Sequence, residues 1–193
     1  MFNKYYLYIY GFFIGIFALF IYPVFITDHP KLYDENGLIE NLQALTLILT
    51  SMLFLLNALK KNRNDRLFML FFAWLTFSFF LREVDVEDFD LPSIIIFLGG
   101  HGVGRNTMLA LGFLTIIFFY IKERKFYNPL IKKFALSFEG VLIIQSAIFL
   151  VCSDFFEKSH SLAYHQFYEE LFELYGYLLL LIAALLLRKE QTL

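Results

Sequence analysis

Charged residues and cysteine are both scarce in this chain. Asp, Glu, Lys and Arg make up 18% of its 193 residues, whereas soluble domains average about 25%. The single cysteine, Cys152, excludes an intramolecular disulfide, a CxxC redox motif and a cysteine-rich zinc site. The composition therefore argues against an ordinary soluble domain.

Common catalytic signatures are also missing. The sequence contains no HExxH zinc motif, no GxSxG nucleophile turn and no GxxxxGK[ST] phosphate loop. Ser51, Ser78 and Ser146 stand singly in apolar runs, where a serine most often bonds to its own helix. No stripe of basic residues with interleaved aromatics indicates nucleic acid as a partner.

Long apolar runs dominate the rest of the chain. It is 59% hydrophobic, with 26 Phe, and a bilayer core of roughly 30 Å takes about 20 apolar helical residues to cross. Six segments reach or approach that length: about 5–26, 38–59, 67–85, 106–121, 134–152 and 165–187. We therefore expect an all-α membrane protein, a six-transmembrane-helix bundle with residues 1–193 in a single integral membrane domain. The first segment is longer than the apolar core of a signal peptide and is expected to stay uncleaved.

A further apolar run, residues 92–98, is too short to span a bilayer. It leads into Gly99-Gly100-His101-Gly102-Val103-Gly104, whose glycines allow tight turns. We expect a re-entrant or interfacial segment near 92–104. His101 and Arg105 are candidates for contact with a lipid phosphate or a carboxylate, and a flexible re-entry loop explains them equally well.

Charges of opposite sign separate once the six segments are laid across a membrane. Twelve of the sixteen Lys and Arg residues lie on one side, at 4, 60–66, 122–133 and 188–189. Such residues in short loops mark the cytoplasmic side, so both termini are expected inside (N-in/C-in). Fourteen of the eighteen acidic residues lie on the other side. The sequence thus predicts a multi-pass cell-membrane protein of the bacterial inner-membrane type, with its polar site facing the outside or periplasm.

The last apolar segment begins with a stripe of ionisable residues. His165, Glu169 and Glu173 are four residues apart and share one helix face, with Glu170 beside them. Glu173 lies about two turns into the span, where a charge normally faces the bundle interior or water. Carboxylates this close need a compensating cation, which can be a metal, a proton or an arginine. The alternative is that the first two turns simply lie in the headgroup region.

Two other segment ends carry polar residues on the same side of the membrane. Glu40 and Gln43 lie three residues apart at the start of the second segment, and Glu40 is already inside the apolar run. Arg82 and Glu83 end the third segment, close to Asp85. The default explanation for Arg82 is a structural ion pair with Glu83, Asp85 or a carboxylate from another helix.

Part of this pattern resembles a known family. The run Glu169-Glu170-Leu171-Phe172-Glu173-Leu174-Tyr175-Gly176 resembles the last-helix motif of the CREST superfamily of hemolysin III proteins, adiponectin-type receptors and alkaline ceramidases. In that family a His-x-x-x-His helix supplies two zinc ligands, so the resemblance places Glu169 and Glu173 at the histidine positions. The Glu40-Asn41 pair is similar to the family's Glu-and-Asn helix start, and Asp85 resembles its Asp after the next helix. The chain also resembles small bacterial membrane proteins of unassigned function.

The leading functional interpretation is a membrane-embedded, metal-dependent hydrolase. It would act on a lipid or lipid-linked substrate at the outer leaflet, with membrane lipids as partners. The expected metal ligands are Glu40, His165, Glu169 and Glu173, the expected bases Glu83 or Asp85, and the expected anion-binding residues Arg82 or Arg105. Oxygen-rich ligands suit Mg, Ca, Mn or carboxylate-bound Zn, and such an ion would activate its bound water.

Two other functions fit the same residues, a cation- or proton-coupled transporter and a non-catalytic protein for membrane binding or assembly. Intramembrane carboxylates commonly carry protons or bind cations. A conducting path, however, needs polar residues in both halves of the membrane. In the inner half only Glu139 and Gln145 stand out, and this asymmetry favours a hydrolase or a binding pocket.

The hydrolase interpretation makes one direct prediction. Mildly purified protein should contain a divalent metal in near-stoichiometric amount by plasma mass spectrometry. The Glu169→Gln/Glu173→Gln variant should lose it, because two ligand charges are removed. Absence of metal from both proteins would leave the carboxylates as proton carriers or as partners of Arg82 and Arg105.

Overall fold

Every regular element in the described part of the chain is helical. The computed structural model describes residues 4–27, 29–33, 37–60, 64–84, 86–88, 90–100 and 102–189. The elements are α1 (Lys4–Ile21), η1 (Tyr22–Ile26), η2 (Pro30–Leu32), α2 (Leu38–Ala58), α3 (Arg66–Glu83), η3 (Val86–Asp88), α4 (Ser93–Gly99), α5 (Val103–Lys122), α6 (Arg124–Ala135), α7 (Phe138–Glu157) and α8 (His165–Lys189). The predicted all-α class is confirmed.

Five helical stretches are long and apolar enough to cross a membrane, judged by length and composition. They are Lys4–Ile26, Leu38–Ala58, Val103–Lys122, Phe138–Glu157 and His165–Leu187. The remaining predicted span corresponds to α3, whose 18 residues include Arg66, Arg82 and Glu83 at the two ends. Five such helices are consistent with the predicted multi-pass membrane protein.

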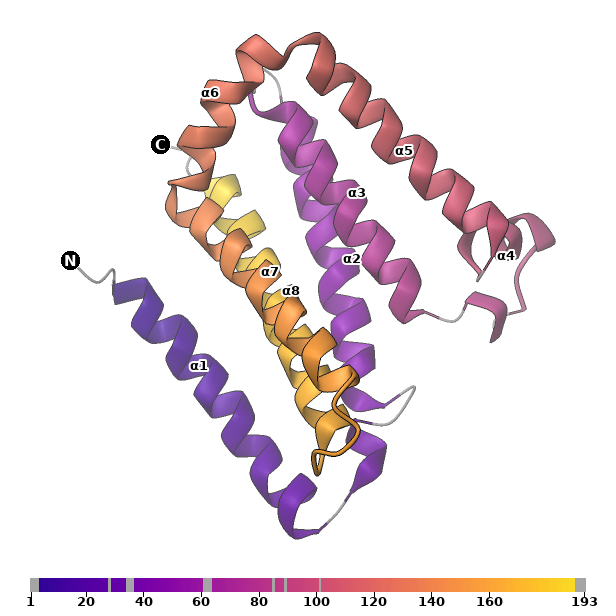
Figure 1. The fold of residues 1–193 in the computed structure, drawn as a ribbon, viewed down its shortest axis with the longest axis vertical. Helices are drawn as coiled ribbons and strands as arrows, with labels where there is room; N and C mark the ends of the chain where they lie inside the picture. The colour runs from indigo at the N-terminus through magenta and orange to yellow at the C-terminus, as the bar shows by residue number, and fades with distance from the viewer. Residues whose placement is uncertain are drawn as a thin grey trace.

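α8 is the central helix of the bundle. It packs against α7 and α2, α2 packs against α3, and α5 lies on the far side of α3 (Figure 1). Gly176, Ala183 and Ala184 are buried along α8, and small residues of this kind let neighbouring helices approach closely. α1 lies along the other flank of the bundle (Figure 1). It is held by the ring of Phe13, which stacks on Tyr175 of α8 at 4.4 Å.

The chain between the fourth and fifth predicted spans forms a helix of its own, α6. The span expected to begin at residue 134 begins instead at Phe138. The Ser137 hydroxyl accepts a hydrogen bond from Gly140 N at 3.1 Å and caps α7. A Cβ on Gly140 would lie 1.9 Å from the Phe134 carbonyl oxygen. The glycine therefore allows the sharp turn from α6 into α7, which the apolar pattern alone did not reveal.

The predicted short segment near 92–104 contains the seven-residue helix α4. α4 packs on η3 and on the start of α5 and lies beside the first turns of α5 (Figure 1). Gly102, directly before α5, has a φ of 149°, a conformation that side-chain-bearing residues rarely adopt. His101 lies outside the described residues.

The two ends of the bundle differ in chemistry. The start of α1, the end of α8 and all of α6 lie toward one end (Figure 1), which we name the basic end after the Lys and Arg residues of these segments. The start of α2, the end of α3 and the start of α8 lie at the opposite end, which we name the acidic end. The acidic end therefore contains the predicted functional residues of α2, α3 and α8, which are Glu40, Arg82, Glu83, His165, Glu169 and Glu173.

Gly112 of α5 sets how closely α5 approaches α3. A Cβ there would lie 2.2 Å from Cε2 of Trp74, and Trp74 Nε1 donates to the Leu109 carbonyl oxygen at 3.1 Å. We expect Gly112→Val to lower the free energy of unfolding by about 1–3 kcal/mol, the usual cost of overpacking. Thermal denaturation in detergent measures the loss.

Gly15 of α1 supplies the matched control, because nothing lies within 4 Å of a Cβ built there. Gly15→Val introduces the same β-branched residue into a helix without the steric overlap. If the two variants lose the same free energy of unfolding, the contact between α5 and α3 is not the cause of the loss.

Candidate functional site at the acidic end

Arg82, at the end of α3, is the centre of an ion-pair network. Its Nη2 donates to Glu173 Oε1 at 2.7 Å and to the Tyr177 hydroxyl at 3.0 Å. Its Nε donates to Glu83 Oε1 at 3.0 Å, and the Tyr177 hydroxyl donates to that same oxygen at 3.0 Å. One guanidinium thus joins two carboxylates and a phenol across α3 and α8.

The carboxylates of this network are buried, whereas the arginine reaches the surface. The side chains of Glu83 and Glu173 are 8% and 12% exposed, and that of Arg82 is 54% exposed. The Ser153 hydroxyl of α7 lies 3.3 Å from Glu173 Oε1 and shares its one proton between that oxygen and the Leu150 carbonyl oxygen at 2.8 Å. Because a buried charge is costly without a partner, Glu173 depends on Arg82 and on the fit of three helices.

Gln43 of α2 extends the network to a fourth helix. This side chain is fully buried, and its Nε2 donates to both the backbone oxygen and Oε2 of Glu170 at 2.8 Å. Gln43 Oε1 is also buried and has no hydrogen-bond partner among the described residues. Buried acceptors are normally satisfied, so this oxygen marks a place suited to a donor or a cation.

Five glutamates gather around the single guanidinium. Glu169 lies within electrostatic range of Glu83 and Glu173, and Glu170 within range of Glu40, Glu83 and Glu173. Counted with Arg82, these residues carry five formal negative charges and one positive charge. The structure therefore brings together Arg82, Glu40, Glu83, Glu169 and Glu173 from three separate stretches of the sequence.

Two of the predicted site residues, His165 and Arg105, make other contacts in the described structure. The His165 ring lies against His160, with ring centroids 5.2 Å apart, and its buried Nδ1 has no partner among the described residues. Arg105 Nη1 donates to the Leu81 carbonyl oxygen at 2.9 Å, which ties α5 to α3. Asp85 lies outside the described residues.

The gathered carboxylates do not have the arrangement of a metal site. Among the described residues, no group of three or more His, Cys, Asp or Glu side chains is placed to hold a metal ion. Glu173 is instead bonded by Arg82 and Ser153. The set Glu40, His165, Glu169 and Glu173 is thus not assembled as a metal site among the described residues, and a bound metal stays a prediction.

Sequence reasoning named some buried polar residues singly but missed that they form two lines, on two helices that pack against α8. One lies on α2 and the other on α7; they comprise Gln43, Thr46, Thr50, Ser51, Asn57, Glu139, Ser146 and Ser153. From Gln43 to Asn57 the distance along α2 is about 21 Å at 1.5 Å per residue. In the sequence these polar residues recur at intervals of three, four and seven, which is a helical repeat. The many apolar residues around them made that repeat hard to recognise.

Some of the buried polar side chains bond a neighbouring helix, whereas others keep a buried polar atom without a partner in the described part of the chain. Ser51 Oγ donates to the Ala73 carbonyl oxygen at 2.9 Å, and Asn57 Nδ2 donates to that of Ala184 at 3.1 Å. By contrast, Asn57 Oδ1, Gln145 Oε1 and Ser146 Oγ are buried and have no partner in the described part of the chain. Buried polar atoms without a partner among the described residues thus occur at several depths of the bundle.

Comparison with known proteins identifies no family for this chain. No protein-family model, no curated protein and no solved structure matches the chain. The resemblance to the CREST superfamily stays a prediction. The interpretation of the acidic end therefore rests on its own geometry.

The Arg82–Glu173 pair should contribute measurably to stability. We expect Arg82→Gln to lower the free energy of unfolding by about 1–3 kcal/mol at neutral pH, because it leaves Glu173 buried without its cation. Arg82→Gln/Glu173→Gln should recover part of that loss, since Glu173 no longer carries a buried charge without its partner. Thermal denaturation of the native protein, both single variants and the double variant measures the coupling.

An exposed ion pair at the same end provides the control. Lys158 Nζ lies 2.6 Å from Asp154 Oδ2, and the side chains are 70% and 57% exposed. Its hydrogen bond with Asp154 raises the pKa of Lys158, but solvent screens the pair. Lys158→Gln should leave the melting temperature almost unchanged. If Arg82→Gln/Glu173→Gln lowers the free energy of unfolding by as much as the two single variants together, Arg82 and Glu173 are not coupled.

Proposed function

We propose that this protein is a six-span membrane protein that couples protons or another small cation to transport. The observation that carries the proposal is a series of buried polar side chains at successive depths of the bundle. The carboxylate network at the acidic end leads into polar residues of α2 and α7 that reach Asn57 and Glu139 near the basic end. Protons and small cations are the ligands that such oxygen-rich groups suit.

The six-span topology follows if α3 also crosses the membrane. Its 18 residues give a length of about 27 Å, close to the roughly 30 Å of a bilayer core, and it packs between α2 and α5. The charged residues then lie at its two ends, where they reach the interfaces. With the basic end in the cytoplasm, both termini are inside and the carboxylate network faces outward.

The buried residues of α2 remove the main sequence argument against transport. Only Glu139 and Gln145 stood out in the inner half of the membrane, whereas Ser51 and Asn57 are also buried between helices there. Unpaired acceptors at Gln43 and Asn57 fit a path that a proton or a cation completes. A metal-dependent hydrolase would need a ligand set that the described residues do not present.

Protonation of Glu173 supplies a physical means of coupling. In the ionised state Glu173 accepts from Arg82 and Ser153, which joins α8 to α3 and α7. A proton on Glu173 removes the charge that Arg82 balances and weakens this junction. Arg82 keeps Glu83 as a partner on its own helix. Loading a proton therefore weakens the contact of Glu173 with α3 without leaving the guanidinium unpaired, while Tyr177 of α8 keeps its bonds to Arg82 and Glu83.

Ion flux into proteoliposomes tests the proposal. A potassium diffusion potential would drive protons inward, and a trapped pH-sensitive dye would record acidification; a parallel assay would follow radioactive sodium uptake. We expect the native protein to exceed empty liposomes in at least one assay. Glu173→Gln should reduce that flux to the level of empty liposomes, because it cannot exchange a proton or balance a cation.

Glu87→Gln is the matched control, since Glu87 is an exposed acid just after the end of α3, at the same end of the bundle. It should retain the native flux. Melting temperatures of all variants separate loss of transport from loss of folding, and Glu170→Gln replaces Glu173→Gln if the latter does not fold. The proposal is contradicted if liposomes with the native protein take up no more protons and no more sodium than empty liposomes.

A further inference from the structure

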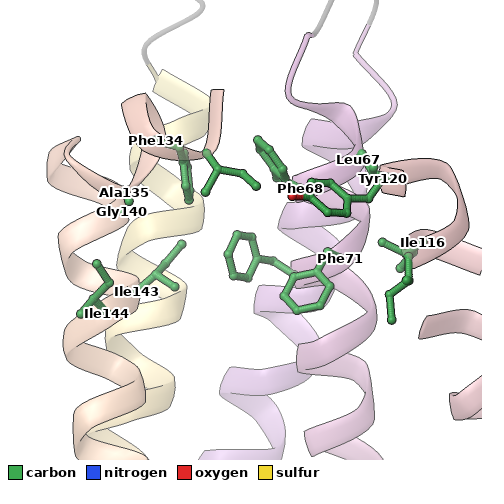
Figure 2. Close-up of a pocket in the computed structure, with 13 residues that line it drawn as sticks. Leu67, Phe68, Phe71, Ile116, Tyr120, Phe134, Ala135, Gly140, Ile143 and Ile144 are labelled. Atoms are coloured by element: carbon green, nitrogen blue, oxygen red, sulfur yellow. The ribbon is translucent and has the colours of Figure 1, made fainter. Parts of the chain in front are cut away.

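An apolar cavity lies at the basic end, between α3, α5, α6 and α7. Its volume is 390 Å³, within the range of about 300–1,000 Å³ typical of small-molecule sites. Figure 2 shows side chains from all four helices around it, among them Phe71, Ile116, Phe134 and Ile144. Tyr120 supplies the one hydroxyl of the lining. Such a lining suits a hydrocarbon chain and offers almost nothing to a polar ligand.

The cavity opens on a surface that lipid would cover. Ile117 and Ile144 both line it, and they are 47% and 49% exposed. They belong to α5 and α7, two helices long and apolar enough to span a membrane. A hydrocarbon chain can therefore enter sideways from the bilayer.

α6 closes the end of the cavity with an amphipathic surface. Its Ile131, Phe134 and Ala135 line the cavity, and the ring of Phe134 lies 6.2 Å from that of Phe68 on α3. Tyr120 at the end of α5 donates to Asn128 Oδ1 of α6 at 2.7 Å. These contacts hold α6 across the ends of the spanning helices, the position of an interfacial helix.

The polar surface of α6 is strongly basic. Arg124, Lys125, Lys132 and Lys133 are all exposed, and none forms an ion pair within the described part of the chain. α6 itself has no acidic residue. Clustered lysines and arginines at the cytoplasmic interface attract anionic lipid headgroups.

We propose that this cavity binds an anionic phospholipid of the inner leaflet. An acyl chain occupies the cavity between α3, α5 and α7, while the phosphate lies at the basic surface of α6. The apolar cavity and the basic helix follow one another along the bundle in the same order as the chain and headgroup of an inner-leaflet lipid. This inference depends on the cytoplasmic location of the basic end and not on the transport proposal.

Native mass spectrometry of protein released from nanodiscs tests the binding. The nanodiscs would contain equal amounts of dioleoyl phosphatidylglycerol and dioleoyl phosphatidylcholine. We expect the native protein to retain phosphatidylglycerol preferentially. Ile116→Trp should abolish that retention by filling the cavity, whereas Leu114→Trp on the exposed face of the same helix should not. Ile117→Phe is the second cavity-filling variant if Ile116→Trp fails to fold.

A second pair of variants tests the headgroup. Lys132→Gln/Lys133→Gln should reduce the preference for phosphatidylglycerol roughly 30-fold, as expected for two lysines at an anionic surface. Lys31→Gln/Lys158→Gln removes two exposed lysines at the acidic end and should leave it unchanged. Equal retention of the two lipids by native protein, or retention unaffected by both cavity-filling variants, overturns the proposal. The proposal is also overturned if a second copy of the chain, in place of lipid, covers the cavity.

Discussion

The arrangement of this bundle depends on how a few buried charges are satisfied where little water is present. Glu173 lies on the most buried of the five apolar spans, and Arg82 reaches it from α3. Tyr177 and Ser153 complete its surroundings. Because each of these groups would be costly alone, the network fixes the positions of α3, α7 and α8 relative to one another.

A second constraint acts along the length of the bundle. Phe and Leu side chains supply dispersion contacts, but lipid tails offer similar contacts, so apolar packing alone gives weak specificity for helix partners in a membrane. Directional bonds from Ser51 to α3 and from Asn57 to α8 select those partners. The acceptors left open beside them are the same groups that suggest a path for protons or cations. Structural specificity and the proposed transport thus depend on the same residues.

Much of the candidate site was predictable from spacing. The four-residue repeat of Glu169 and Glu173 placed both on one helix face, and the depth of Glu173 in its apolar run required a compensating cation. Sequence spacing could not show that this cation is Arg82, which is 91 residues away in the sequence. His165, which shares the face by periodicity, lies instead against His160, because a residue in the first turn of a helix is also positioned by the preceding loop.

The sequence by itself determined the helical class, the presence of helices long and apolar enough to cross a membrane, and the segregation of charge along the chain. These features depend on local composition. Tertiary structure decided which carboxylate meets Arg82, which face of α2 is buried and where α6 turns into α7. Those outcomes depend on helix rotation and on close contacts such as that of Gly140 with Phe134. Helix rotation is poorly specified when apolar residues surround a helix on every side, and only packing between helices resolves it.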